Sequence, residues 1–552
     1  MKHLAIALLG LLLATPAAAE RPSDTLLIGR IYPTALTTVP VAALAYDRDG
    51  RVLAHGSSQD VRKLLEARKG VVNEIVVAGS VIPGLIDAHG HMLNLGFSLL
   101  QADLVGTRSK ADVIERLRAK VDALAPGEWL LGRGWDQNDW QEQQFPSAAD
   151  LDHAFPDRPV WLERVDGHAG WANSMALRAA KLAADTPDPA GGRIERGANG
   201  APTGVFVDTA MDLVQRQVPK PSADLSRRAL RLALQSAVAA GLTGVHDAGV
   251  SRDDLALYRE LADDDALPLR VYAMADGDGA ALDWLCRKGA YAHPGGRLGM
   301  RTVKLYADGA LGSRGAALLA DYADDPGNRG LMIETPEKLA QEVKRAADCG
   351  VQPAVHAIGD RANRATLDAY AALGAEQRTR LRPRIEHAQV IDLPDIPRFG
   401  ALGVIASMQP THATSDMPWA QARVGADRLR GAYAWRRLLD SGARLALGSD
   451  FPVERVDPLL GIHAAVTRQD ASGEPAGGWL PDQRLTLAEA LDGFTRGAAF
   501  AGHAETAVGT LEVGRRADFV VLSMDPHQVR GRALLAIKVK STWVDGRKVW
   551  PM

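Results

Sequence analysis

The sequence lacks the features that mark several large classes of protein. Only two of its 552 residues are cysteine, which excludes a scaffold held together by many disulfides. Its 64 Lys and Arg are outnumbered by 67 Asp and Glu, so it has no basic surplus to bind nucleic acid. It has no long polar or low-complexity tract, which argues against disorder. A hydrophobic content of 46% over this length predicts a large core and more than one domain.

Long apolar runs are missing too, except at the start, which is MKHLAIALLGLLLATPAAAE. Lys2 is followed by the apolar stretch Leu4–Leu13 and then by the small residues Ala17–Ala19. This order is typical of a secretory signal peptide over residues 1–19, because the apolar stretch falls short of the ~20 residues that span a membrane. A retained N-terminal anchor is the alternative. We expect an exported mature protein, periplasmic or secreted, without membrane attachment after cleavage.

The two cysteines, Cys286 and Cys349, lie in segments with helical patterns. Export would permit a disulfide between them. Because free cysteine behaves as a small apolar residue, we expect two buried thiols rather than a bonded pair.

Both ends of the chain have the pattern of short β-strands. Near the N-terminus, VAALAYDRDGRVLAHG alternates in polarity and turns at Asp49-Gly50. Near the C-terminus, ADFVVLSMDP is a candidate strand, and STWVDGRKVW is a second hairpin with its own Asp-Gly turn. Because chain termini often lie close together, we expect residues 20–80 and 505–552 to form one composite β-sandwich domain.

Residues 81–504 alternate between strand-like and helix-like segments. Eight apolar stretches have polar ends: SVIPGLIDAHGH, GLTGVHDAG, LPLRVYAMAD, RTVKLYADGA, VQPAVHAIGD, RPRIEHAQ, GVIASMQPTHA and RLALGSDFP. This repeated alternation predicts an α/β fold, a (β/α)8 TIM barrel. An open doubly wound sheet is the alternative, but it does not explain why polar residues end every strand.

A long insert, residues 93–240, separates the first two predicted strands. That is too much chain for one loop, so we expect the insert to form a structure of its own. In a barrel it would emerge at the C-terminal end of the first strand, over the active site. We therefore interpret it as a lid that sets specificity.

Two histidines end the first predicted strand, in VIPGLIDAHGHM. His89 and His91 face the same side, because residues two apart in a strand do so, and their imidazoles can converge on one ion. Further candidate ligands lie at the ends of later strands: Lys304, His356, His387 and Asp450. Barrel closure would bring these ends around one axis. Histidine nitrogens and a carboxylate suit zinc or a similar divalent cation.

Each of these residues has an ordinary explanation when taken alone. A histidine at a strand end is often simply hydrogen-bonded, and Lys304 could be structural. Asp450 could form a turn or cap a helix. The combination, spread over the ends of separate strands, favours a metal centre.

Longer motifs resemble a known family over nearly the whole mature chain. PGLIDAHGHM is similar to the first-strand HxH motif of the metal-dependent amidohydrolase superfamily, and GSDFPV to its eighth-strand aspartate motif. LEVGRRADFVVLS and TWVDGRKVW resemble its closing β segments. GRGWDQ, DGHAGWANS, VKLYADGALGSR and VHAIGDRAN resemble the amidohydrolase-3 branch, which contains enzymes similar to N-substituted formamide deformylase.

The resemblance implies a site for two divalent metal ions, with zinc as the expected metal. The ligands so implied are His89, His91 and Asp450 for the first ion, and His356 and His387 for the second. Lys304 would bridge both ions as a carbamate formed with carbon dioxide, because an ammonium group cannot bind a cation. The alternative is an unmodified Lys304 and one ion held by the first three residues.

This chemistry predicts a metal-dependent hydrolase, an amidohydrolase that cleaves a non-peptide amide-type C–N bond of a small molecule. Metal-activated hydroxide would attack the carbonyl carbon, while Asp450 takes the proton of the water and delivers it to the leaving nitrogen. Hydrolysis of an ester, carbamate or cyclic amide is one alternative. A catalytically inactive binding protein on the same fold is another.

Four further residues have a weaker claim to the site. His168 in the insert and Arg314 after the fourth strand could bind substrate, and a structural role fits each equally well. His246 and His412, near the second and seventh strands, are interpreted as hydrogen-bonded polar residues. A small-molecule substrate is the expected partner, and a homo-oligomer is compatible with the sequence.

Overall fold

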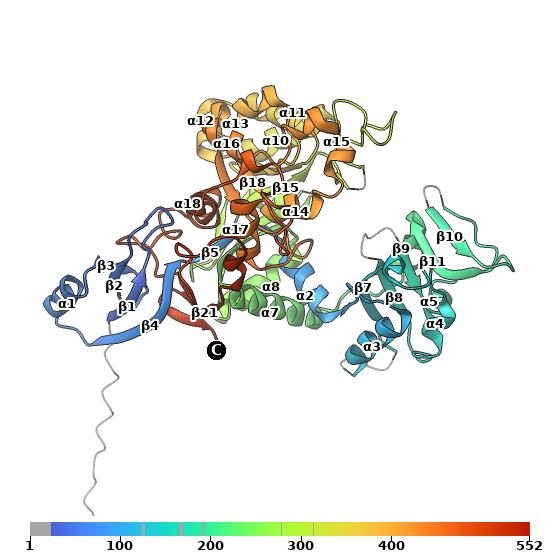
Figure 1. Ribbon diagram of the computed structural model, residues 1–552, viewed down its shortest axis with the longest axis horizontal. Coiled ribbons are helices and arrows are strands. Elements are labelled where there is room, and N and C mark those ends of the chain that lie inside the picture. The colour runs from blue at the N-terminus through green and yellow to red at the C-terminus, as the bar shows by residue number, and fades with distance from the viewer. Residues whose placement is uncertain are drawn as a thin grey trace, which may run out of the picture.

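The structure of the protein is a computed structural model. It describes residues 24–551 except 123, 125, 126, 165–168, 190, 191, 278 and 313. The predicted signal peptide and His168 therefore lie outside the described residues. Within the described residues, no helix has the length and apolar character needed to cross a membrane. Figure 1 shows a barrel with a small β domain on one side and the insert on the other.

Eight parallel strands form the barrel. In sheet order they are β5 (Leu85–Gly90), β12 (Leu242–Val250), β13 (Arg270–Asp276), β15 (Leu298–Tyr306), β16 (Gln352–Ala357), β17 (Arg384–His387), β18 (Ile405–Met408) and β19 (Arg444–Leu447). A parallel bridge between Gly90 and Phe451 brings the first and last strands together and nearly closes the ring. A short extra strand, β14 (Tyr291–Ala292), pairs antiparallel with β15. These are the eight strands expected from the sequence, so the predicted barrel is confirmed.

Helices pack around the barrel strands, and α10 shows how one of them buries an apolar face. In α10, the side chain of Thr335 caps the N-terminus, and the buried face includes Leu339, Val343 and Ala347, spaced four residues apart. The helices of this part are α2 (Met92–Leu100), α7 (Ala223–Ala239), α8 (Arg252–Asp263), α9 (Ala280–Lys288), α10 (Pro336–Asp348), α11 (Asp360–Ala371), α12 (Ala375–Leu381), α13 (Ile396–Leu402), α14 (Pro410–Asp416), α15 (Ala420–Leu429), α16 (Trp435–Asp440), α17 (Pro458–Thr467), α18 (Leu487–Asp492) and α19 (Ala498–Ala501).

The two ends of the chain share one seven-stranded sheet, in the order β22-β21-β20-β4-β1-β2-β3. Its elements are β1 (Asp24–Ile31), β2 (Val41–Tyr46), β3 (Val52–Gly56), α1 (Ser58–Ala67), β4 (Val72–Pro83), β20 (Phe519–Leu522), β21 (Val539–Val544) and β22 (Arg547–Trp550). The two ends join where β20 pairs antiparallel with β4. Leu26 packs with α1 on one face, whereas Leu27 packs with Phe519 on the other. The composite β domain is therefore one continuous sheet with apolar residues on both faces.

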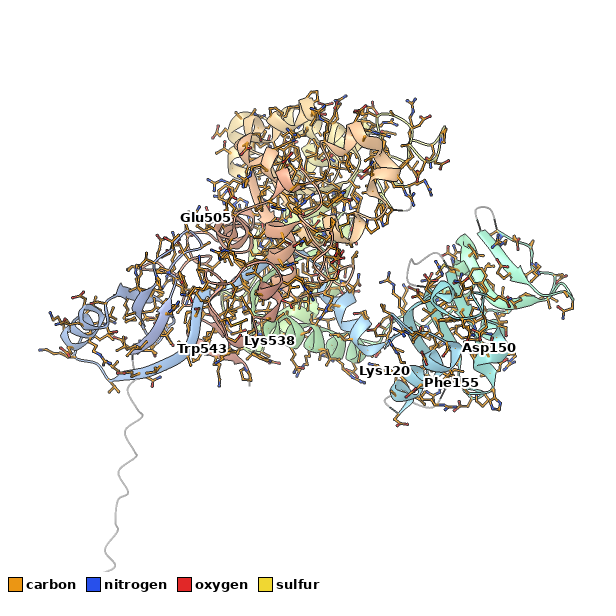
Figure 2. The ribbon with its side chains drawn as sticks, viewed as in Figure 1. Lys120, Asp150, Phe155, Glu505, Lys538 and Trp543 are labelled. Atoms are coloured by element: carbon orange, nitrogen blue, oxygen red, sulfur yellow. A yellow bond between two sulfur atoms is a disulfide. The ribbon has the colours of Figure 1, made fainter. Side chains whose placement is uncertain are left out.

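The insert has its own mixed sheet, in the order β10-β11-β9-β8-β7-β6. Its elements are β6 (Ala102–Asp103), α3 (Lys110–Val121), β7 (Leu130–Trp135), α4 (Ala148–Asp152), β8 (Val160–Arg164), β9 (Ala169–Ala172), α5 (Ser174–Ala179), β10 (Gly192–Arg196), β11 (Pro202–Asp208) and α6 (Asp212–Gln215). Trp135, Trp140 and Trp171 pack ring against ring in its core. Figure 2 shows Asp150 and Phe155 in this part, to one side of the barrel. Its role as a lid stays a prediction.

The expectation of two free thiols was wrong. Cys286 in α9 and Cys349, which caps the C-terminus of α10, form a disulfide with a Cα–Cα distance of 4.8 Å. The two helices follow β13 and β15, which are adjacent strands of the barrel, so the helices come together on its outer surface. A helical pattern in the sequence gives no information about this lateral contact, because it depends on strand order.

Candidate metal centre

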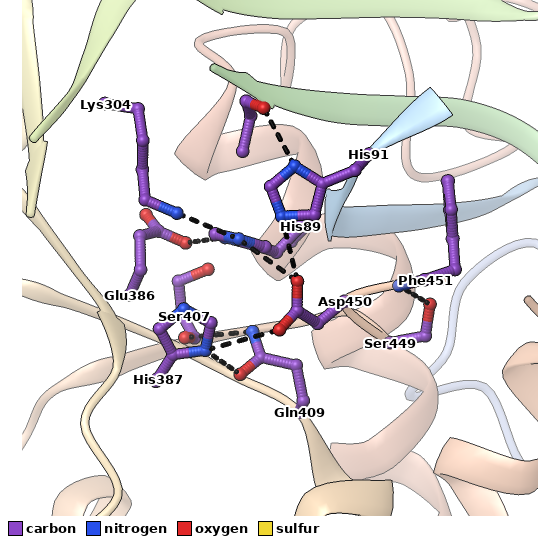
Figure 3. Close-up of polar contacts among 12 residues, drawn as sticks. His89, His91, Lys304, Glu386, His387, Ser407, Gln409, Ser449, Asp450 and Phe451 are labelled. Carbon is purple, nitrogen blue, oxygen red and sulfur yellow. Dashed lines mark hydrogen bonds and ion pairs between the residues drawn. The ribbon is translucent and has the colours of Figure 1, made fainter. Parts of the chain in front are cut away.

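All six predicted ligands gather at the C-terminal ends of the barrel strands. Figure 3 shows five of them, His89, His91, Lys304, His387 and Asp450. The imidazole centroid of His387 lies 4.8 Å from that of His89 and 4.6 Å from that of His356. The Nζ atom of Lys304 lies 3.1 Å from Nε2 of His89. The carboxylate of Asp450, which follows β19, lies against the two histidines of the HxH motif. The structure thus brings together residues that are up to 361 positions apart.

The hydrogen bonds of His89 and His91 leave the Nε2 atom of each ring available to bind a cation. His89 Nδ1 lies 2.6 Å from Oε2 of Glu386, and His91 Nδ1 lies 3.0 Å from the carbonyl oxygen of Ala248. Both partners only accept hydrogen bonds, so each Nδ1 carries the proton and each Nε2 carries a lone pair. Those Nε2 atoms lie 3.6 and 3.1 Å from Oδ1 of Asp450. Three electron-pair donors that face one another fit a divalent cation.

The second group is centred on His387. Its Nδ1 donates to Oε1 of Gln409 at 2.8 Å, which again leaves Nε2 with a lone pair. Nε2 of His356 is buried and has no hydrogen-bond partner among the described residues; it lies 3.6 Å from Oδ1 of Asp308. Possible ligand atoms of His387, His412 and Asp450 also lie within 4.8 Å of one another. The lone pairs of His356 and His387 therefore fit a second cation as well.

Burial keeps these imidazoles neutral, which is the form that binds a metal. Burial and the charge of Lys304 lower the pKa of His89 to about 4 and that of His356 to about 3. Burial, followed by the neighbouring His356, lowers the pKa of His387 well below its usual value. Burial also lowers the pKa of Lys304 to about 8, so its amine loses its proton more readily than an exposed lysine does.

His412 and Glu454 hold the carboxylate of Asp450. His412 Nε2 lies 3.2 Å from Oδ2 of Asp450, and His412 Nδ1 lies 3.2 Å from Oε1 of Glu454. Although burial opposes its charge, these two carboxylates raise the pKa of His412 to about 10. Despite burial, the hydrogen bond from His412 holds the pKa of Asp450 well below its usual value. His412 was predicted to be an ordinary hydrogen-bonded residue, and in the fold it is the partner of Asp450.

A buried ion pair behind His89 was missed. Arg384 donates from Nε to Oε1 of Glu386 at 2.8 Å and from Nη2 to Oε2 at 3.1 Å, and neither side chain is exposed. Although burial opposes ionisation, the charge of Arg384 and the hydrogen bond from His89 keep the pKa of Glu386 below its usual value. A signal was present in RIEH, where two opposite charges two residues apart face the barrel interior within an apolar strand.

Asp87 ties the first barrel strand to the last. Its side chain accepts hydrogen bonds from the amide and the hydroxyl of Ser449, and from the amide of His89. Asp450 follows Ser449 in the chain, and its φ of 63° turns its carboxylate toward the histidines. No role was predicted for Asp87, although it lies in the VIPGLIDAHGHM motif.

The two predicted substrate-binding residues have different outcomes. His168 lies outside the described residues. Arg314 forms a two-point ion pair with Asp324, with distances of 3.1 and 3.0 Å, which is the structural role left open by the sequence. Its side chain keeps about a third of its surface exposed.

The parallel barrel with histidine and carboxylate groups at its C-terminal end defines a metal-dependent hydrolase class. The chain belongs to the amidohydrolase family, whose model matches residues 79–550. The amidohydrolase resemblance found in the sequence is thereby confirmed.

Several relatives match nearly the whole chain. Protein YtcJ of Bacillus subtilis (strain 168), named provisionally as an amidohydrolase, is 34% identical over 92% of this chain and 95% of its own length. Protein LONG AFTER FAR-RED 3 of Arabidopsis thaliana is 35% identical over 96% and 92%. N-substituted formamide deformylase of Arthrobacter pascens is 28% identical over 90% and 93%. An uncharacterized metal-dependent hydrolase from Pyrococcus horikoshii OT3 has a similar structure, with a TM-score of 0.78 and 29% identity over 92% of this chain and 99% of that one.

Proposed function

We propose that this protein is an exported amidohydrolase that cleaves a non-peptide C–N bond of a small molecule. The observation that carries the proposal is the arrangement of His89, His91 and Asp450, whose lone pairs face one another while both Nδ1 atoms are held by acceptors. Buried acceptors in this arrangement repel unless a cation or a proton lies between them. A structure that keeps them so arranged supports a metal site.

The proposed cofactor is a pair of divalent ions, with zinc as the expected metal. His89, His91 and Asp450 would hold one ion, and His356 and His387 the other. Lys304, as a carbamate, would bridge them. When bound, such ions supply a Lewis acid for a carbonyl oxygen and lower the pKa of water.

The protein residues divide the remaining work. The lowered pKa of Asp450 favours its ionised form, and its carboxylate lies against His89 and His91, so it can accept a proton from water and return it to the leaving nitrogen. His412, charged and paired with Glu454, holds the Asp450 carboxylate in place and limits its rotation. Glu386 and Arg384 fix the tautomer of His89 from behind.

The class of bond is proposed from the relatives. The Arthrobacter pascens relative is named as an N-substituted formamide deformylase, which supports a test of N-formyl compounds first. The Cys286–Cys349 disulfide supports an exported location, because disulfides persist in oxidising compartments. A small-molecule substrate is proposed as the partner, and a homo-oligomer is compatible with the fold.

Metal analysis combined with substrate profiling tests the proposal. Purified protein should contain about two equivalents of divalent metal, and should hydrolyse members of a panel of N-formyl and N-acyl amines. Substrates matched in all but the cleaved bond separate the alternatives. If the ester, carbamate or cyclic amide is hydrolysed faster than every matched amide, the protein is a hydrolase of that bond instead. Full metal occupancy with no turnover of any panel member would favour a binding protein.

A further inference from the structure

A cavity of about 250 Å³ lies at the end of the barrel opposite to the metal centre. Its lining includes residues near the starts of neighbouring strands, such as Thr243 in β12, Arg270 in β13 and Leu298 in β15. The metal-centre residues lie at the other ends of the strands. The segment Ala499–Ala504 and the short strand β14 complete the wall. None of the proposed metal ligands lines this cavity.

His246 presents an unused hydrogen-bond donor to this cavity. Its side chain is buried, and its Nδ1 lies 2.9 Å from Nη1 of Arg384. A guanidinium group only donates, so Nδ1 of His246 accepts and the ring proton is on Nε2. That Nε2 atom has no hydrogen-bond partner among the described residues, and a methyl group placed on Gly502 in the cavity wall would lie 2.8 Å from it.

Arg301 adds a positive charge without a carboxylate partner among the described residues. It lies at a register shift of β15, where Ala273 and Met274 of β13 are paired with Met300 and Thr302, so the strand bulges at Arg301. Its Nε is buried without a hydrogen-bond partner among the described residues. Two other arginines of the wall, Arg270 and Arg297, differ in that both are paired with Asp545.

The remaining wall supplies apolar surface and no free negative charge. Apolar lining residues include Ile86, Val271, Met300 and Val508. Asp518, the acidic residue of the wall, is engaged by Arg270 at 2.7 Å. Burial, followed by the charges of Arg301 and Arg382, lowers the pKa of His503 to about 4, so this wall histidine is neutral.

We propose that this cavity binds a compact monocarboxylate with an apolar body, whose carboxylate pairs with Arg301 and accepts a hydrogen bond from Nε2 of His246. An apolar cavity of ~150 Å³ holds a benzene ring, so about 250 Å³ accommodates one ring with its carboxylate. A neutral ligand would leave Arg301 unpaired, and a dianion would bring one negative charge too many. The ligand enters past Tyr291, His293 and Gly296, which form a partly exposed rim.

The proposed site is joined to the metal centre by buried hydrogen bonds. His246 accepts from Arg384, Arg384 donates to Glu386, and Glu386 accepts from Nδ1 of His89. A carboxylate on Nε2 of His246 makes the ring a stronger acceptor for Arg384, which weakens the hold of Arg384 on Glu386. The occupied cavity should therefore change the metal affinity of the centre, and by linkage the metal should change the affinity for the carboxylate equally.

Calorimetric titration of the metal-loaded protein with benzoate tests the site, with benzyl alcohol as the neutral analogue. We expect saturable benzoate binding and at least tenfold weaker binding of benzyl alcohol, because a charge-assisted hydrogen bond is lost.

Variants of the cavity wall test which residues hold the carboxylate. Arg301→Met should weaken benzoate binding at least tenfold without lowering the melting temperature, since it removes an unpaired charge. Gly502→Ala should also weaken benzoate binding, because its methyl group would cover His246 Nε2, and the exposed Arg48→Met is the control that should bind normally.

Benzoate binding that persists in both Arg301→Met and Gly502→Ala would locate the ligand elsewhere and overturn the proposal. Absence of binding of both benzoate and 3-methylbutanoate to the wild-type protein at 10 mM would also overturn the proposal. That concentration is about ten times a millimolar dissociation constant, so it would nearly saturate even a weak site. The link to the metal centre is tested by chelator competition with and without saturating benzoate. A shift in metal affinity that is absent in Arg301→Met supports the link, and an unchanged affinity in the wild type overturns it.

Discussion

Nδ1 of His89 lies 2.6 Å from Oε2 of Glu386, and both side chains are completely buried. Arg384 holds the other side of the same carboxylate. A buried carboxylate, itself held by a buried guanidinium, therefore fixes the proton of His89 on Nδ1 and directs its lone pair into the metal centre.

Glu386→Gln should weaken metal binding ten- to a hundredfold, because the neutral amide holds the imidazole less firmly. It should also lower the free energy of unfolding by about 3 kcal/mol or more, since Arg384 is left as an unpaired buried charge. Chelator competition and chemical denaturation measure the two effects. Glu74→Gln, which alters the exposed pair with Arg62, is the matched control and should change neither quantity. Wild-type metal affinity in Glu386→Gln would show that the pair serves stability alone.

Asp450→Asn should keep the fold and lose most turnover. The amide cannot accept a proton from water, so kcat should fall by a factor of about 10²–10⁴. Steady-state kinetics on a substrate from the panel measure the loss, and circular dichroism checks the fold. The exposed Asp440→Asn should retain full activity. Comparable turnover in the two variants would remove Asp450 from the proposed role.

Formation of the proposed carbamate on Lys304 should depend on pH. Carbon dioxide reacts with the neutral amine, and burial lowers the pKa of Lys304 to about 8. The reactive fraction is therefore about half at pH 8 and only about one hundredth at pH 6, because each pH unit below the pKa reduces it about tenfold. Metal-free protein given ¹³C-bicarbonate and zinc should show a carbamate ¹³C signal at pH 8 that is much weaker at pH 6. The absence of the signal at both pH values would favour the single-ion site.

Cys286→Ser should destabilise the folded protein. The disulfide closes a loop between residues 63 positions apart, which corresponds to a loss of about 2–4 kcal/mol when the bond is removed. Thermal unfolding of Cys286→Ser and of the reduced wild-type protein should show similar decreases in melting temperature. The oxidised wild-type protein is the reference, and a variant as stable as this reference would show that the bond contributes nothing.

Arg270→Met should loosen the β domain from the barrel. Arg270 begins β13 and pairs with Asp518 at 2.7 Å and Asp545 at 2.5 Å, both contributed by the C-terminal segment of the β domain. Removal of this largely buried cation leaves the buried carboxylate of Asp518 uncompensated, whereas Asp545 keeps its pair with Arg297, so we expect a loss of about 3 kcal/mol. Denaturant unfolding measures it, with Arg62→Met as an exposed control of the same type. Equal stability of the two variants would show that Arg270 does not hold the β domain to the barrel.

Much of the architecture followed from the sequence alone. The eight barrel strands were predictable because each is a short apolar run with polar residues at its C-terminal end, and parallel strands in a barrel are buried on both faces. His89, His91, Lys304, His356, His387 and Asp450 could be named for the same reason. A polar residue at the end of a buried strand is unusual enough to be noticed, and the barrel topology places all such ends together.

Only the tertiary structure decided which side chains hold these ligands. The partners of the site are contacts across the barrel: Glu386 behind His89, His412 beside Asp450, and Ser449 on Asp87. The Cys286–Cys349 bond depends in the same way on adjacent strands placing two helices together. Sequence periodicity shows which face of a helix or strand is buried, because the apolar residues of that face recur at a fixed spacing within the element itself. It does not report what lies opposite that face, because a lateral contact depends on the order and register of strands far apart in the chain.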